Sequence, residues 1–449
     1  MENKHLSSPL IWLGIVGAAV LMGIGVGILG PWISLIILVV LIGLILGRNL
    51  QLLMAAILFS VALGQFGRIP PGTPSGAILL IDLLVCLLAG LWIWWVLLKR
   101  QKLVLSAAHL FWLGFIFLAG ASLLFGPFDL SKRELLESGF YLVRFAAYTS
   151  LLWIIPVLFS NQEGREKLRR WLYWTGFAVM TLGFFQLSII PDIGFFSRFG
   201  WDPHVGRLVS TFLDPNYLGG FFALFLALVV APTVQESKKL PWFLIGLILL
   251  ATILTFSRSG YLAVGLVALI FGLRFSWKVV LISLICIIPL ALTVPRVRER
   301  VAGGFSIDKT AQDRITSWQN ALLIGDQYWV AGVGYNTYER AQEVFGILVP
   351  GSTSRANAGS DSSLLNVLAT TGVVGTALFL AAIGLCLRDC YRLVRSKPKS
   401  VGASMAFALL LATPALFIHA FFVNAFFYPF ILVILATMMG IVYSELRDV

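Results

Sequence analysis

The amino-acid sequence predicts an all-α integral membrane protein, a polytopic bundle of about 12 to 14 transmembrane helices with one long extracytoplasmic loop. Hydrophobic residues make up 59% of its 449 residues and charged residues only 12%, and its mean hydropathy is +0.92. These values exclude a disordered chain and are typical of proteins whose solvent is the bilayer. The third observation is a series of apolar runs of about 20 residues, the length that a helix needs to cross a membrane.

The apolar runs divide the chain into about 14 candidate spans, with an uncertainty of about two. They cover residues 10–29, 31–47, 49–67, 77–98, 107–125, 137–159, 168–190, 215–233, 241–257, 258–274, 277–294, 363–387, 404–423 and 426–445. The first two are separated only by Gly30 and Pro31, and another tight pair meets at Arg258. We therefore expect residues 1–449 to form a single transmembrane domain.

The basic residues predict the orientation of these spans. Lys and Arg in short loops resist translocation and mark the cytoplasmic side. Five clusters fall on one face of the predicted bundle: residues 99–102, 165–170, 238–239, 274–278 and 388–399. The protein is then expected in the inner cell membrane, with both termini on the cytoplasmic side. The net charge of +12 follows from this topology, and because no basic patch is interleaved with aromatic residues, nucleic acid is excluded as a partner.

The sequence indicates neither a metal nor a cofactor. Its four cysteines, Cys86, Cys286, Cys386 and Cys390, lack the paired spacing of a zinc site or a disulfide framework. There is also no Asp-x-Asp pair, phosphate-binding loop, His-Glu-x-x-His or Gly-x-Ser-x-Gly motif. We therefore expect chemistry that needs side chains alone.

One connection, residues 295–362, is far longer than the others, and the predicted orientation places it on the extracytoplasmic side. Loops longer than about 15 residues usually have a function. Within it, residues 313–324 carry apolar side chains at Ile315, Trp318, Ala321 and Leu322, the spacing of an amphipathic helix. We expect this helix to lie along the outer membrane surface.

The first group of candidate site residues precedes the span at 215–233. Asp214 is a suitable helix cap and Pro215 a suitable first residue, so the unpaired amides of that helix start face outward. Together with Arg207, such a start predicts an anion site. The alternative is that Arg207 contacts only the phosphates of membrane lipids.

The second group is Ser257 and Arg258, in a tight turn between two spans. An arginine costs less near the end of a membrane helix than at its centre, but a hairpin does not need one, so a functional role is favoured. Arg144 lies inside a span, where it either snorkels to the surface or pairs with an acid.

The third group is Arg314 with Trp318 on the amphipathic helix, followed by Gly332-Val333-Gly334. The alternative is an ordinary interfacial helix with an aromatic anchor. The glycines do not follow a strand, so they do not indicate a dinucleotide site.

The fourth group is Asp361, just before the span at 363–387, with His204 and His419 as further proton-transfer candidates. Asp361 is either a helix cap or a base that accepts a proton from a hydroxyl. His419 stands among aromatic residues, a setting more typical of a structural histidine.

These residues together predict a basic, metal-poor outer cavity. Such a cavity suits a lipid-linked diphosphate, which Arg207, Arg258 and Arg314 would hold while a glycosidic bond breaks. Asp361 would activate the acceptor hydroxyl.

At these motifs the chain resembles the O-antigen ligase and polymerase superfamily, membrane glycosyltransferases that use a sugar chain on a polyprenyl diphosphate. The resemblance covers about residues 200 to 376. It rests on Arg207 with Asp214-Pro215-Asn216, on Thr255-Phe256-Ser257-Arg258, on Asp313-Arg314-Ile315-Thr316-Ser317-Trp318 with Gly332-Val333-Gly334, and on Ser363-Leu364-Leu365-Asn366 through Gly375.

The resemblance implies a fold like that of C-type glycosyltransferases and an inverting transfer to a lipid, glycan or protein hydroxyl. Substrate-binding roles are expected for His204, Asn216, Ser257, Trp318 and His419, and catalytic roles for the three arginines and Asp361. Ligases of the family usually carry a histidine at the head of the last motif, where this chain has Asp361. A polysaccharide polymerase, and a transporter of inorganic carbon or lipid-linked sugar, are the alternatives.

Overall fold

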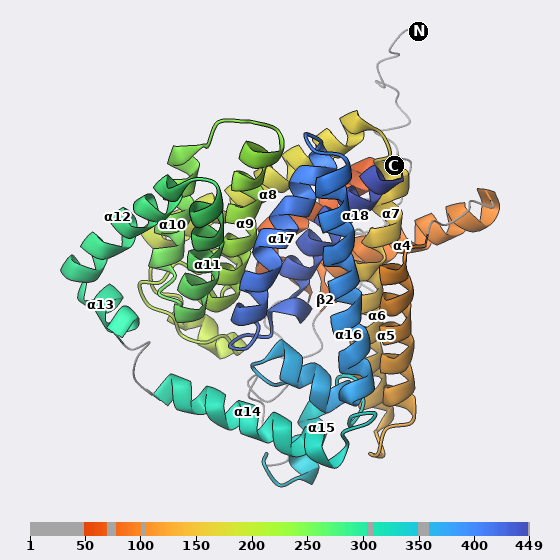
Figure 1. Cartoon of the computed structure of the whole chain (residues 1–449). Helices are drawn as coiled ribbons and strands as arrows, with labels where there is room; N and C mark the ends of the chain where they lie inside the picture. Colours follow the sequence, from red (N-terminus) through yellow and green to blue (C-terminus); the bar gives the residue numbers. More distant parts are fainter. Residues whose placement is uncertain (1–48, 70–77, 100–104, 303–308, 349–358, 448–449) are drawn as a thin grey trace, which may run out of the picture.

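The computed structural model describes residues 49–69, 78–99, 105–302, 309–348 and 359–447 (Figure 1). Most of these residues are helical. The exceptions with regular pairing are β1 (Arg68–Ile69) and β2 (Ile78–Leu79), which form a short antiparallel ladder. The protein is an all-α polytopic membrane protein, which confirms the predicted fold class.

Within the described residues, nine helical segments are long and apolar enough to cross a membrane. They are α3 (Leu50–Leu63), α4 (Leu80–Lys99), α5 (Ala107–Leu124), α6 (Lys132–Thr149) continued by α7 (Leu151–Leu158), α8 (Gln162–Ile189), α9 (Pro215–Gln235), α16 (Ser363–Ser396), α17 (Val401–His419) and α18 (Pro429–Leu446). Among the described residues, α10 (Trp242–Leu254) and α12 (Trp277–Thr293) are shorter apolar helices, and α11 (Arg258–Arg274) lies between them. Twelve of the predicted spans coincide with these helices, and the spans at 10–29 and 31–47 lie outside the described residues.

The centre of the bundle is formed by α9, α17 and α18, whose side chains are buried over most of their length. Helix α17 packs against both α9 and α18, and α11 packs against α9 (Figure 1). The peripheral helices instead turn apolar side chains outward, as with Phe117 on α5 and Leu273 on α11, which are 79% and 76% exposed. A helix that is apolar both toward the bundle and toward its surroundings is typical of a protein embedded in a bilayer.

Three helices are described between α12 and α16, leaving aside residues 303–308 and 349–358: α13 (Pro295–Ala302), α14 (Lys309–Gln327) and α15 (Tyr338–Val344). The predicted amphipathic helix is confirmed as α14, which runs across one end of the bundle and packs against α16 (Figure 1). Its Ala321 and Ile324 side chains are buried, whereas Leu322, expected on the apolar face, is half exposed. We refer to this end as the α14 end.

Helix α16 is broken at Gly372, which has a φ of 65°. The segment after α14 inserts at this break, where Gly334 N donates to Thr370 O at 3.0 Å. A Cβ atom on Gly372 would lie 2.2 Å from Val330 O, and one on Gly332 would lie 2.3 Å from the carbonyl carbon of Thr370. Glycine is therefore required on both sides of the contact, because any side chain would strike the backbone opposite.

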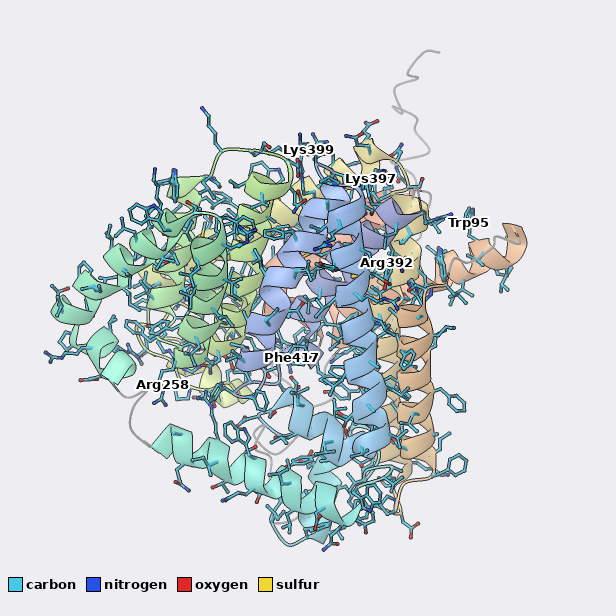
Figure 2. All side chains as sticks on the ribbon, in the orientation of Figure 1. Trp95, Arg258, Arg392, Lys397, Lys399 and Phe417 are labelled. Atoms are coloured by element: carbon cyan, nitrogen blue, oxygen red, sulfur yellow. The ribbon has the colours of Figure 1, made fainter. Side chains whose placement is uncertain are left out.

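The opposite end of the bundle is held by buried ion pairs. Arg165 on α8 pairs with Glu445 on α18 at 3.0 Å, and Lys397 pairs with the same carboxylate at 2.7 Å. Figure 2 shows Lys397 and Lys399 at this end, far from Arg258 at the α14 end. The two ends of the bundle thus differ in their polar residues as well as in their helices.

Candidate functional site

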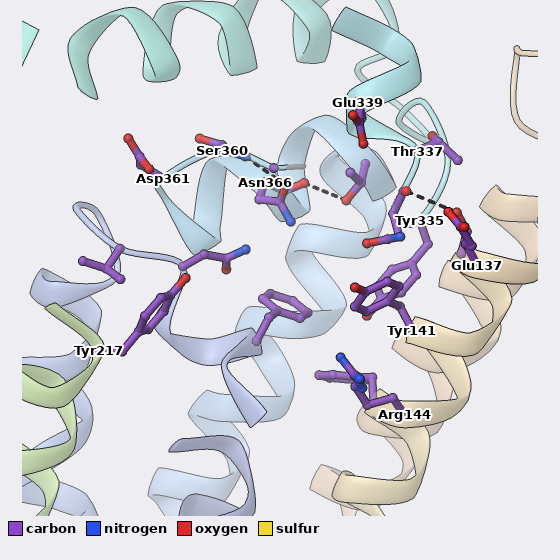
Figure 3. Close-up of a pocket in the computed structure, with 18 of the residues that line it drawn as sticks. Glu137, Tyr141, Arg144, Tyr217, Tyr335, Thr337, Glu339, Ser360, Asp361 and Asn366 are labelled. Carbon is purple, nitrogen blue, oxygen red and sulfur yellow. Dashed lines mark hydrogen bonds between the residues drawn. The ribbon is translucent and has the colours of Figure 1, made fainter. Parts of the chain in front are cut away.

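A cavity of about 920 Å³ opens at the α14 end of the bundle. Its walls come from α6, the start of α9, α14, the segment around α15, the start of α16 and the turn after α17. Three of the predicted site residues line it: Asn216, Arg314 and Asp361. Figure 3 shows Asp361 on one side of the cavity, with Glu137, Tyr141 and Arg144 along α6 on the other.

Asp361 lies just before α16, and its backbone N–H donates to Ser317 Oγ at 3.1 Å. The helix cap is Ser362, whose hydroxyl accepts from Leu365 N. The alternative that Asp361 is only a cap is therefore wrong. Burial raises the pKa of the Asp361 carboxyl above its ordinary range, while the Arg314 guanidinium opposes this shift and Asp313 adds to it. The Arg314 guanidinium thus interacts electrostatically with the Asp361 carboxylate at the cavity.

Arg314 and Trp318 are four residues apart on α14 and so lie on one side of the helix. Trp318 Nε1 donates to Phe421 O at 2.9 Å, in the turn after α17. The Arg314 guanidinium lies 5.8 Å from the centre of the Phe422 ring. Trp318 is not among the residues that line the cavity. It anchors α14 to the bundle and thereby holds Arg314 in the cavity wall.

Asn216 stands in the first turn of α9, whose start is as predicted. Asp214 Oδ1 accepts from Asn216 N at 2.7 Å, and Pro215 is the first helical residue. The Asn216 side chain accepts a hydrogen bond of 2.8 Å from Ser257 Oγ. Ser257 also caps α11 by accepting from Gly260 N. The starts of α9 and α11 are therefore joined side chain to side chain.

Arg207 lies against the turn between α10 and α11. Its Nε donates to Thr255 O at 2.8 Å and its Nη2 to Phe256 O at 3.2 Å. These carbonyls stand at a helix end, where the backbone needs partners from elsewhere. Arg258, the first residue of α11, is half-buried at the α14 end (Figure 2). Neither arginine is among the residues that line the cavity.

The expectation of a basic cavity is wrong. Among the described residues, its lining has only three guanidinium groups, from Arg144, Arg314 and Arg340. Eight carboxylates face them, from Glu134, Glu137, Asp202, Asp214, Asp313, Glu339, Glu343 and Asp361. Half of these acids come from α6 and α15, which carry none of the sequence motifs described above. The balance of charge in the cavity is therefore acidic.

The two histidines lie outside the cavity lining. His419 is fully buried at the end of α17, and its Nε2 donates to Asn216 O at 3.0 Å. This contact supports the backbone of Asn216, in keeping with a structural histidine. His204 is partly exposed in the loop before α9, and its carbonyl accepts from Ile193 N at 3.0 Å.

Arg144 is a cavity residue to which the motifs gave no role. Its Nη2 lies 2.5 Å from Asp82 Oδ2, which confirms pairing with an acid rather than snorkelling. The Tyr148 hydroxyl donates to the other oxygen of Asp82. Arg144 and Tyr148 both line the cavity, and Asp82 is buried behind them. A charge within an apolar span was the one signal that pointed to this residue.

The described residues contain no group of three or more His, Cys, Asp or Glu side chains arranged to hold a metal ion. The four cysteines are free thiols. The polar groups available for chemistry in the cavity are thus carboxylates, guanidiniums, amides and hydroxyls.

A family model described as O-antigen ligase matches residues 243–380 of the chain. The match includes Ser257, Arg258, Arg314 and Asp361, and Asn216 precedes it. No curated protein matches the chain. The matched region contains the Ser-Arg turn, α14 and the start of α16, three of the elements that carried the resemblance in sequence, whereas Arg207 and Asp214-Pro215-Asn216 precede it. The chain is therefore a multi-pass membrane protein, and its residues 243–380 are similar to the O-antigen ligase family.

Proposed function

We propose that this protein transfers a saccharide from a polyprenyl diphosphate to an acceptor hydroxyl at the outer side of the cell membrane. The observation that carries the proposal is that the Arg314 guanidinium and the Asp361 carboxylate line the same cavity. The first supplies a cation for a leaving diphosphate and the second a carboxylate for the proton of the acceptor. Both lie in the region that matches the O-antigen ligase family.

In the proposed reaction, the acceptor oxygen attacks the anomeric carbon of the donor sugar. The bond from that carbon to the diphosphate oxygen breaks, and its electron pair stays on the diphosphate. Asp361 takes the proton of the acceptor hydroxyl, and the configuration at the anomeric carbon inverts. Cations near the diphosphate stabilise the negative charge that grows there.

We assign the diphosphate to the side of the cavity nearest the starts of α9 and α11. Arg314 lines this cavity, and Arg258 stands at the start of α11, on the same end of the bundle. Arg207 holds the turn that precedes Arg258 through two backbone carbonyls. Its proposed role is thus to position this turn and to add positive charge nearby.

We further propose that the α14 end is extracytoplasmic and that both termini are cytoplasmic. Lys397 and Lys399 stand at the opposite end (Figure 2), and basic residues mark the cytoplasmic side. An acceptor on a lipid, a glycan or a protein would then approach from outside the membrane.

The test is turnover by the purified protein of a polyprenyl diphosphate oligosaccharide with a soluble hydroxyl acceptor. Arg258→Ala should lower kcat by about 100-fold or more, the usual loss on removing a group that stabilises developing charge. Arg274→Ala is the matched control, because Arg274 ends the same helix at its other end. A wild-type rate in Arg258→Ala would remove this residue from the mechanism. Transport of the lipid-linked sugar without cleavage would contradict the proposed function itself.

A further inference from the structure

The side of the cavity between α6 and α15 carries four glutamates. Glu134 and Glu137 come from α6, and Glu339 and Glu343 from α15. We call these four residues the glutamate wall. Figure 3 shows Glu137 and Glu339 on the side of the cavity opposite Asp361.

Among the residues that the structure describes, few cations offset the glutamate wall. Arg340 pairs with Glu343 at 3.0 Å. Glu137 pairs with Arg133, whose side chain is 82% exposed, and an exposed pair of this kind is weak. Partial burial raises the pKa of Glu339, and repulsion from Glu343 and Glu137 raises it further. The carboxylates therefore lie close enough to repel one another, and an excess of negative charge faces the cavity.

Below the glutamate wall, the cavity is lined by two tyrosines. Tyr335 is only 7% exposed, and no described residue forms a hydrogen bond with its hydroxyl. Its backbone N–H donates to Ser122 Oγ at 3.1 Å, which fixes the backbone at this position. Tyr141 lies one turn from Glu137 on α6, with its ring 4.9 Å from the Arg144 guanidinium. The Tyr335 hydroxyl is therefore available as a donor or acceptor for a ligand hydroxyl.

We infer that the glutamate wall, with Tyr141 and Tyr335, binds the sugar units of the transferred or accepting saccharide and selects neutral or amine-bearing sugars over anionic ones. Ionised carboxylates only accept hydrogen bonds, and sugar hydroxyls and ammonium groups donate them. Tyrosine rings offer an apolar face to the C–H face of a sugar ring and a hydroxyl at the edge. A uronate or phosphorylated sugar would meet carboxylates of its own charge.

This inference rests on the proposed function and deepens it, because it divides the cavity by charge. The diphosphate belongs with Arg314 near Asp361, and the sugar chain extends toward α6 and α15. Such a division keeps the anionic part of the donor away from the carboxylates and leaves them free to bind hydroxyls.

The test uses the full-length protein in lipid nanodiscs and three trisaccharide probes of equal length. These are chitotriose, which is neutral, its deacetylated form at a pH below the pKa of its amines, and trigalacturonate, which is anionic. Ligand-observed NMR titration gives each Kd. We expect the neutral and amine probes to bind at least about tenfold more tightly than the anionic probe, since each like charge costs about two- to fivefold.

Two variants locate the effect. Glu137→Gln with Glu339→Gln should reduce the preference for the amine probe over the anionic probe by about two- to fivefold for each charge removed. Tyr335→Phe should weaken chitotriose binding by about two- to tenfold, the range expected for one hydrogen bond. Glu163 is an exposed glutamate in the first turn of α8. Glu163→Gln is the matched control and should leave the Kd of all three probes unchanged.

The outcomes separate this inference from the proposed function. Equal binding of the three probes, or the same Kd for chitotriose in Tyr335→Phe and wild type, would overturn the saccharide site. Charge-selective binding in a protein that transfers no sugar would contradict the proposed function and leave the binding site standing. If the protein transfers the saccharide but binds the three probes equally, the proposed function stands and the saccharide site is contradicted.

Discussion

Ser257 Oγ donates a hydrogen bond of 2.8 Å to Oδ1 of Asn216, and this contact joins the starts of two membrane helices. The same Ser257 hydroxyl caps α11 by accepting from Gly260 N. His419 holds the backbone of Asn216 from the side of α17. Asn216 is thus held by residues of two other helices, α11 and α17, and it also lines the cavity. Loss of either contact should therefore displace the Asn216 side chain in the cavity.

Ser257→Ala should lower both stability and turnover. The loss of a cap and a hydrogen bond together costs about 2 kcal/mol, and the displaced Asn216 should reduce kcat/KM by about tenfold or more. Ser400→Ala is the matched control, because Ser400 caps α17 at the other end of the bundle through Ala403 N. Thermal unfolding and turnover are measured on both variants. Equal turnover in the two would mean that the Ser257 contact is only structural.

Asp361→Asn should lower kcat/KM by about 10²- to 10⁴-fold, because an amide cannot take the proton of the acceptor. The fold should persist, since Ser362 rather than Asp361 caps α16. Asp313→Asn, an exposed neighbour that also lines the cavity, should stay within a few-fold of wild type. Turnover and the melting temperature are the measurements. A fully active Asp361→Asn protein would exclude the carboxylate as the base.

The pH profile of kcat/KM should fall on its acid side at a pH above the ordinary range of an aspartate. Burial raises the pKa of Asp361, and the base works only when deprotonated, so the rate is lost as the pH falls through that raised pKa.

Arg314→Gln should move this acid limb to higher pH, in addition to lowering the rate. The guanidinium lowers the pKa of Asp361, so its removal lets the pKa rise further. Arg298→Gln removes an exposed arginine of α13 that does not line the cavity, and should leave the limb in place. An unshifted limb in Arg314→Gln would show that the titrating group is not Asp361.

Gly372→Ala should loosen the α14 end. The added Cβ would lie 2.2 Å from Val330 O, at a φ of 65°, and strain of this kind costs about 1–3 kcal/mol or more. Gly384→Ala lies on the same helix with nothing within 4 Å of the added atom and should be neutral or stabilising by up to about 1 kcal/mol. Thermal unfolding and limited proteolysis between α14 and α16 are the measurements. Equal stability of the two variants would contradict the tight contact.

Several features followed from sequence because their causes are local. Runs of about 20 apolar residues form helices in a bilayer whatever their neighbours are, so the spans within the described residues were predicted. The start of α9 at Pro215 and the amphipathic α14 rest on caps and spacing that act within a few residues.

The character of the cavity depended on tertiary structure. Arg144 finds Asp82 from 62 residues away, and the glutamates of α6 meet those of α15 only because the chain folds back after α14. Side chains within one motif also take different directions, as Arg207 turns to the carbonyls of Thr255 and Phe256 while Asn216 faces the cavity. The sequence alone determined the helices and their ends, because these depend on hydropathy and short-range hydrogen bonds. Packing decided which charges share a cavity, because this depends on the direction of each side chain and on contacts between distant segments.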